Sequence, residues 1–185
     1  MKKLNLVAGV LVAVLVAGCA AVPISTMFGM RNFGLADFLA LDPGYLRVAT
    51  QLPQGVDWNG GKVTLSLKLT RKDGSVDSFT LPLREIALEQ LGNSGLPSAN
   101  SGMHWQAFML TDTGVAEFRK IQVNLSVRRE DYKGFTLNIQ APFTDASYDV
   151  LKTKTKIRIE IWLRLTPAQG FFELLNASQP LKMSD

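Results

Sequence analysis

Alternation of apolar and polar residues dominates this chain from residue 45 onward. Over residues 62–70, valine and leucine occupy every second position, and lysine, serine and threonine occupy the others. The same alternation recurs over 135–141 and 157–165. Because successive side chains of a strand point to opposite faces, each stretch predicts a strand with one buried and one solvated face. The Asp73-Gly74 step after the first stretch predicts a hairpin turn.

Further strands are indicated by weaker patterns. The return strand after the hairpin carries Phe79, Leu81 and Leu83 on one face, and Pro82 near its end suits the edge of a sheet. Six or more short alternating strands with turn signals favour two packed antiparallel sheets. We therefore predict a mainly β, β-sandwich-like antiparallel domain with one or two short helices. The weaker strands are expected at 46–52, 103–110 and 171–175.

Residues 112–128 carry two competing patterns. Apolar residues alternate over 121–127 as in a strand, yet Val115, Phe118 and Leu125 lie on one face of a helix. A Thr-Asp pair just before this segment is a suitable helix cap. We favour a helix from Asp112 into the 120s and keep a strand as the alternative. Two shorter helical stretches are expected at 35–41 and 84–91.

The first part of the chain has the organisation of an export signal. Two lysines precede an apolar stretch, Leu6 to Val16, which ends in the small residues Ala17 and Gly18 before Cys19, the only cysteine. These are the three parts of a secretory signal peptide. The apolar stretch is shorter than the roughly 20 residues that a membrane-spanning helix needs. The run Val16-Ala17-Gly18-Cys19 resembles a bacterial lipobox.

The resemblance to the bacterial lipoprotein class implies a processing route. Residues 1–18 are removed by cleavage between Gly18 and Cys19, the Cys19 sulfur carries a diacylglycerol, and the new amine is acylated. Ala20, in place of an aspartate, implies an outer-membrane location facing the periplasm. The domain organisation expected is a signal peptide (1–18), a lipidated and apolar connecting segment (19–44) and one domain (45–185). The connecting segment is predicted to pack on the domain's own surface or, alternatively, on the bilayer or a partner.

Composition argues against several kinds of partner. The formal net charge of +4 includes two lysines of the signal peptide, so the small remaining charge and the envelope location disfavour nucleic acid. His104 is the only histidine, and no carboxylate lies at metal-ligand spacing around it. We expect a structural histidine and no metal or cofactor. No nucleophile motif surrounds any serine, and we predict no enzymatic activity.

A late strand carries the most suggestive surface. Five cations and a tryptophan are predicted to share one strand face, because residues at every second position point the same way. Lysines on an edge strand prevent edge-to-edge pairing, which is one interpretation. The other is a surface for an anionic partner such as lipid headgroups or an acidic protein, since tryptophan and arginine are enriched at binding hot spots. The residues are Lys152, Lys154, Lys156, Arg158, Trp162 and Arg164.

Three functional hypotheses follow. The leading one is a non-catalytic binding or assembly module of the cell envelope, anchored to the membrane through Cys19. The second is a carrier or sensor of a small apolar or lipidic ligand, and the third is an enzyme with an unrecognised carboxylate site. An exposed apolar patch favours the first, a closed apolar cavity the second, and converging carboxylates in a cleft the third.

The lipid anchor is directly testable. Replacing Cys19→Ser removes the sulfur that accepts the diacylglycerol, so we expect the variant to lose fatty-acid label and to leave the membrane fraction. Metabolic labelling with a radioactive fatty acid measures the first effect, and cell fractionation the second. Equal labelling of wild type and Cys19→Ser would contradict the lipobox assignment.

Overall fold

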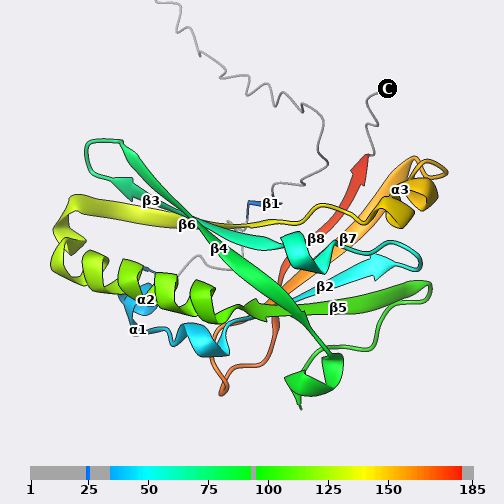
Figure 1. The fold of residues 1–185 in the computed structure, drawn as a ribbon, viewed down its shortest axis with the longest axis horizontal. Helices are drawn as coiled ribbons and strands as arrows, with labels where there is room; N and C mark the ends of the chain where they lie inside the picture. The colour runs from blue at the N-terminus through cyan, green and yellow to red at the C-terminus, as the bar shows by residue number, and fades with distance from the viewer. Residues whose placement is uncertain (1–23, 26–33, 93–94, 181–185) are drawn as a thin grey trace, which may run out of the picture.

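The computed structural model describes residues 24–25, 34–92 and 95–180 of the chain, and leaves the signal peptide, Gly18 and Cys19 outside the described residues. The predicted mainly β fold is confirmed: eight antiparallel strands form one curled sheet in the order β1-β6-β3-β4-β5-β2-β7-β8 (Figure 1). The strands are β1 (Ile24–Ser25), β2 (Arg47–Pro53), β3 (Thr64–Arg71), β4 (Val76–Ile86), β5 (Met103–Leu110), β6 (Tyr132–Gln140), β7 (Lys156–Arg164) and β8 (Phe172–Pro180).

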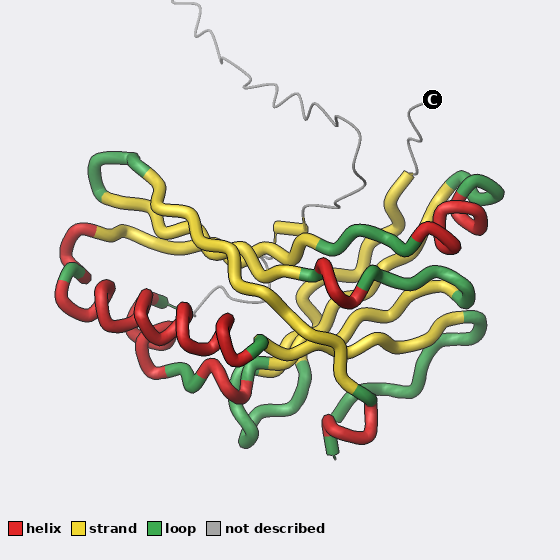
Figure 2. Tube along the Cα trace, in the orientation of Figure 1, coloured by secondary structure: helices red, strands yellow, loops and turns green. Residues whose placement is uncertain are grey.

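Three α-helices and four 3₁₀ turns complete the described fold. α1 and α2 lie together at one end of the sheet and α3 at the other (Figure 2). The helices are α1 (Leu35–Ala40), α2 (Asp112–Val127) and α3 (Asp145–Leu151). The 3₁₀ turns are η1 (Pro43–Tyr45), η2 (Gly60–Lys62), η3 (Leu88–Leu91) and η4 (Arg129–Asp131).

Strand β4 joins the two halves of the sheet. Its first part, Val76–Pro82, pairs with β3, and its second part, Leu83–Ile86, pairs with β5. The two predicted sheets are therefore two halves of one continuous sheet that curls around a shared core. Pro82 lies at the change of partner, where its carbonyl accepts a hydrogen bond from the Thr111 amide at 3.0 Å. A proline has no amide hydrogen to donate. It is tolerated here because the side of β4 that faces away from β3 has no described strand partner before Leu83.

The interior between the two halves is filled by aliphatic side chains. Leu65 and Leu67 of β3 meet Ile159, Ile161 and Leu163 of β7 in one apolar cluster, and each of these residues is at most 2% exposed. A cavity of about 10 Å³ lies between the halves, lined by leucine and isoleucine side chains of the described strands and loops. The alternating patterns in the sequence thus correspond to strands whose apolar face points into this interior.

Part of the connecting segment belongs to this core. Phe38 of α1 is fully buried, and its ring stacks on Phe118 of α2 with 4.7 Å between centroids. The Gln122 side chain of α2 donates hydrogen bonds to the carbonyls of Phe38 and Leu41, both at 2.8 Å. The segment therefore packs on the domain's own surface where it is described, and the folded unit begins before residue 45.

The ambiguous segment 112–128 is helical. Thr111 caps α2 by accepting a hydrogen bond from the Gly114 amide at 3.0 Å. Phe118, Ile121 and Leu125 are buried, as the helical pattern predicts. The competing alternation leaves Val123 and Val127 on the surface, 64% and 82% exposed.

Two local segments differ from the expectation. The expected helix over 84–91 is strand up to Ile86, because β5 pairs with this part of β4, and only η3 is helical. Helix α3 was not expected from the sequence; Thr144 caps it, because its side chain accepts a hydrogen bond from the Ser147 amide. Both segments are short, so their side-chain pattern says less than the tertiary contacts that fix them.

Removing the Phe38 ring tests whether α1 is part of the core. Phe38→Ala deletes a fully buried aromatic, and we expect the free energy of unfolding to fall by about 3–5 kcal/mol. Val123→Ala on the exposed face of α2 is the control, with an expected change within about 0.5 kcal/mol. Urea unfolding of the two variants measures both values. A Phe38→Ala loss as small as the control's would contradict the packing of α1.

Candidate functional site

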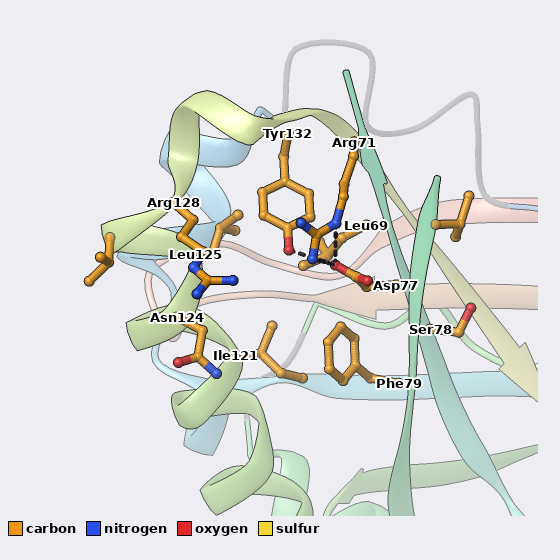
Figure 3. Close-up of a pocket in the computed structure, with 12 residues that line it drawn as sticks. Leu69, Arg71, Asp77, Ser78, Phe79, Ile121, Asn124, Leu125, Arg128 and Tyr132 are labelled. Carbon is orange, nitrogen blue, oxygen red and sulfur yellow. Dashed lines mark hydrogen bonds and ion pairs between the residues drawn. The ribbon is translucent and has the colours of Figure 1, made fainter. Parts of the chain in front are cut away.

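A cleft of about 740 Å³ lies between the C-terminal half of α2 and the hairpin of β3 and β4. Figure 3 shows Phe79 of β4 facing Ile121 and Leu125 of α2 across this space. Leu69 of β3 also lines its apolar part. Val127 of α2, at 82% exposure, stands at its rim. The cleft is thus open to solvent and partly apolar.

One margin of the cleft is a strand edge that has no strand partner among the described residues. The Arg71 amide bonds to the Ser75 carbonyl, and the Leu83 amide to the Val63 carbonyl. Along an antiparallel pair of strands, hydrogen-bonded residue pairs alternate with pairs that are not hydrogen-bonded. The odd-numbered residues between 75 and 83 are therefore the ones that exchange hydrogen bonds with β3. The amides and carbonyls of the even-numbered residues 76–80 therefore point away from β3. On that side the next strand, β5, begins to pair only at Leu83.

The helix is fixed close to β4 at one end only. A Cβ atom added to Gly114, in the first turn of α2, would lie 2.7 Å from the Pro82 carbonyl oxygen. This approach leaves no room for any side chain at that position. The cleft lies toward the other end of the helix, near Leu125 and Arg128. α2 therefore covers the edge of β4 near Pro82 and leaves it accessible near Val76.

A charged cluster lines part of the cleft. Both Arg71 Nε, at 3.0 Å, and Nη2, at 2.7 Å, donate to Asp77 Oδ2, and the Tyr132 hydroxyl donates to the same oxygen at 2.6 Å. These hydrogen bonds lower the pKa of Asp77 below its usual value, and the bond from Tyr132 has the largest effect. The same carboxylate raises the pKa of Tyr132. Asp77 is thus held as an anion with its charge already matched.

The α2 side of the cleft contributes a cation and an amide. Arg128 and Asn124 line it, and Arg128 forms no ion pair with any described residue. Asp77 is the single carboxylate among the described lining residues. The cleft therefore offers an apolar floor, one unpaired guanidinium and unused main-chain hydrogen-bonding groups.

The predicted cationic stripe is divided by the fold. Lys152 and Lys154 do not share the strand face, because β7 begins only at Lys156. Lys152 follows helix α3 and pairs with Asp149 at 2.9 Å. β7 lies between β2 and β8, so the interpretation of an edge strand protected by lysines has no basis in this topology.

Within β7, a buried acid interrupts the remaining cations. Glu160 is 3% exposed and pairs with Arg158 at 2.8 Å. Asn100 of the loop before β5 donates to Glu160 Oε1 at 2.9 Å. Trp162, farther along the face, packs edge-on against Trp105 with 6.2 Å between centroids. The chain's own loop and aromatic residues thus occupy much of this face, which leaves Lys156 at one end and Arg164 at the other.

His104 has a carboxylate partner but no nucleophile. Its Nε2 lies 2.8 Å from Asp57 Oδ1. Ser147 approaches the same residue, yet its hydroxyl bonds to the backbone of Asp57, accepting from the amide at 2.7 Å and donating to the carbonyl at 3.1 Å. These contacts hold helix α3 against the loop after β2. In the described part of the chain, no group of three or more His, Cys, Asp or Glu side chains is placed to hold a metal ion.

Comparison with known proteins yields no relative: no family model, no curated protein and no solved structure matches this chain. Among the residues that the structure describes, no helix has the length and apolar character to cross a membrane. The site is therefore interpreted from its own geometry.

The Asp77 cluster predicts a pH-dependent contribution to stability. Because the pKa of Asp77 is lowered in the folded state, its contribution is present above about pH 4 and is lost as the pH falls through that lowered value. Asp77→Asn should lower the free energy of unfolding at pH 7 by up to about 1 kcal/mol, as for exposed ion pairs. The difference from wild type should shrink at pH 2–3.

Urea unfolding at both pH values measures this difference. Asp149→Asn is the matched control, since its carboxylate is 78% exposed and pairs only with Lys152. A penalty for Asp77→Asn that is as large at pH 2–3 as at pH 7 would show that the charge of Asp77 does not produce it.

Proposed function

We propose that this protein is a lipid-anchored module of the bacterial cell envelope that binds an extended segment of a partner protein in the cleft between α2 and β4. The observation that carries the proposal is the free edge of β4 beside an apolar floor. Exposed apolar side chains, Val76 and Val127, stand at the rim of the same cleft. This is the arrangement that favours a binding or assembly module over the other two hypotheses.

Strand addition is the mode of binding that fits this edge. A partner segment in extended conformation supplies main-chain groups to the free amides and carbonyls of Val76, Ser78 and Thr80. Its alternate side chains then face the α2 side of the cleft, where Val127 is exposed. The unpaired Arg128 favours an acidic side chain at one end of the segment. Main-chain bonds supply affinity, and the apolar and charged contacts supply selectivity.

The alternatives find less support in the described residues. A carrier that encloses an apolar ligand needs a closed cavity of several hundred cubic ångströms. The cavity described between the sheet halves is about 10 Å³, and the larger cleft beside α2 is open to solvent. A carboxylate enzyme needs converging acids, and the cleft holds Asp77 bound to Arg71 and Tyr132. We therefore propose a non-catalytic role.

The anchor proposed at Cys19 places the domain near a membrane surface. β1 begins at Ile24, where it pairs with Ile139 of β6. Five residues of chain extend at most about 18 Å, so Ile24 would lie within that distance of a lipidated Cys19, with β6 one strand spacing farther away. We propose the outer membrane, periplasmic side, as the location, with a partner in an envelope complex.

Site-specific crosslinking in the native cells tests the proposed cleft. A photo-crosslinking residue at Val127 should capture a partner, whereas the same residue at Leu88, 41% exposed on η3, should not. Ser78→Pro removes an amide donor from the free edge without removing a bond to β3. We expect Ser78→Pro to reduce the Val127 crosslink at least fivefold.

Ser78→Ala is the matched control, because it keeps the backbone amide and should leave the crosslink unchanged. A circular dichroism melt of Ser78→Pro establishes that the variant is folded. A Val127 crosslink that survives Ser78→Pro in a folded protein would contradict binding by strand addition.

A further inference from the structure

A row of arginines crosses the outer face of the sheet, remote from the cleft. Arg84 of β4 pairs in register with Met109 of β5, Met109 with Arg47 of β2, and Arg47 with Arg164 of β7. Residues in one such row point to the same face. The neighbours Val48 and Leu163 belong to the interior cluster, so this row points outward. The alternation in the late strand indicates Arg164 alone, because Arg47 and Arg84 come from segments distant in the sequence.

The three guanidinium groups lie near one another without an acidic partner. Strands are about 4.8 Å apart, so Arg47 and Arg164 are direct neighbours and Arg84 is about 10 Å from Arg47. None of the three forms an ion pair with a described residue. Burial, followed by the charges of Arg164 and Arg84, lowers the pKa of Arg47. Such an arrangement of like charges is unfavourable unless an anion compensates it.

Two of the arginines are held in place by the chain and keep donors unused. Arg47 Nη1 donates to the carbonyls of Gly44 at 2.7 Å and Leu46 at 2.9 Å. Arg164 Nη1 donates to the Leu91 carbonyl at 3.1 Å, and its guanidinium lies 5.1 Å from the centre of the Phe171 ring. The Nε atoms of both arginines are buried without a hydrogen-bond partner. Each guanidinium is thus oriented, and buried donors remain to be satisfied.

We propose that Arg47, Arg84 and Arg164 bind a phosphate group. Guanidinium groups donate paired hydrogen bonds to phosphate oxygens, and their fixed orientation reduces the entropy lost on binding. The same chemistry is offered by a free phosphate ion and by the phosphodiester of a lipid headgroup. The site is independent of the proposed cleft, which lies beside the other half of β4.

Titration calorimetry on the full-length lipoprotein in neutral detergent distinguishes the two sources. One arm uses inorganic phosphate, and the other uses glycerophosphoglycerol, the anionic headgroup of phosphatidylglycerol without its acyl chains. Glycerophosphocholine, which carries a compensating positive charge, is the control ligand. Binding to either anionic probe should weaken as salt is added, because exposed charges are screened.

The variants separate the arginine row from general positive charge. Arg84→Gln and Arg164→Gln should each weaken binding about tenfold, as expected for loss of a charged hydrogen bond. Arg129→Gln, which removes one exposed cation elsewhere, should leave binding unchanged. The Arg84 guanidinium forms no hydrogen bond with a described residue, whereas that of Arg164 bonds to the Leu91 carbonyl. Arg84→Gln should therefore fold even if Arg164→Gln does not.

A second readout needs no bound ligand. In phosphate-free, low-salt buffer, Arg84→Gln should melt at a higher temperature than wild type, because one of three like charges is removed. Added phosphate should abolish this difference. Failure of wild type to bind either probe, or equal weakening by Arg84→Gln and Arg129→Gln, would overturn the phosphate site and leave the proposed cleft untouched.

Discussion

Strand β4 joins the two halves of the sheet by changing its partner at Pro82. A single strand pairs with β3 up to Pro82 and with β5 from Leu83, and this lets one sheet curl around a single core. The same change leaves one side of Val76–Thr80 without a strand partner in the part of the chain that the structure describes. Helix α2 starts where the partners change, tied to Pro82 by the Thr111 amide, and its far end leaves the cleft open.

The sequence predicts those features that depend on local periodicity. Alternation over 62–70 and 157–165 predicts strands with one buried face, and the cap at Thr111 predicts α2, because both patterns report which side chains meet the core. The cleft was not predictable in this way. A free strand edge depends on which strands are neighbours in the sheet. The residue pattern of 76–80 does not predict that β5 pairs with β4 only from Leu83.

The cationic surface shows the same limit. The even-numbered positions of a strand point to one face, and Lys152, Lys154 and Arg164 all have even numbers. The strand β7 begins only at Lys156, however, so the two lysines lie outside it. Conversely, Arg47 and Arg84 meet Arg164 only through the register of four strands. The fold thus presents two distinct surfaces on different parts of one sheet: an open edge beside an apolar cleft, and a row of guanidinium groups that form no ion pair with a described residue.

Amide hydrogen exchange along β4, measured by NMR, tests the free edge most directly. We expect slow exchange at Asp77, Phe79 and Leu81, whose amides bond to β3, and fast exchange at Ser78 and Thr80, whose amides point away from β3. A partner segment bound in the cleft should slow exchange at Ser78 and Thr80 alone. Equal protection of all five amides in the free protein would show that this edge is already paired, and would contradict the account.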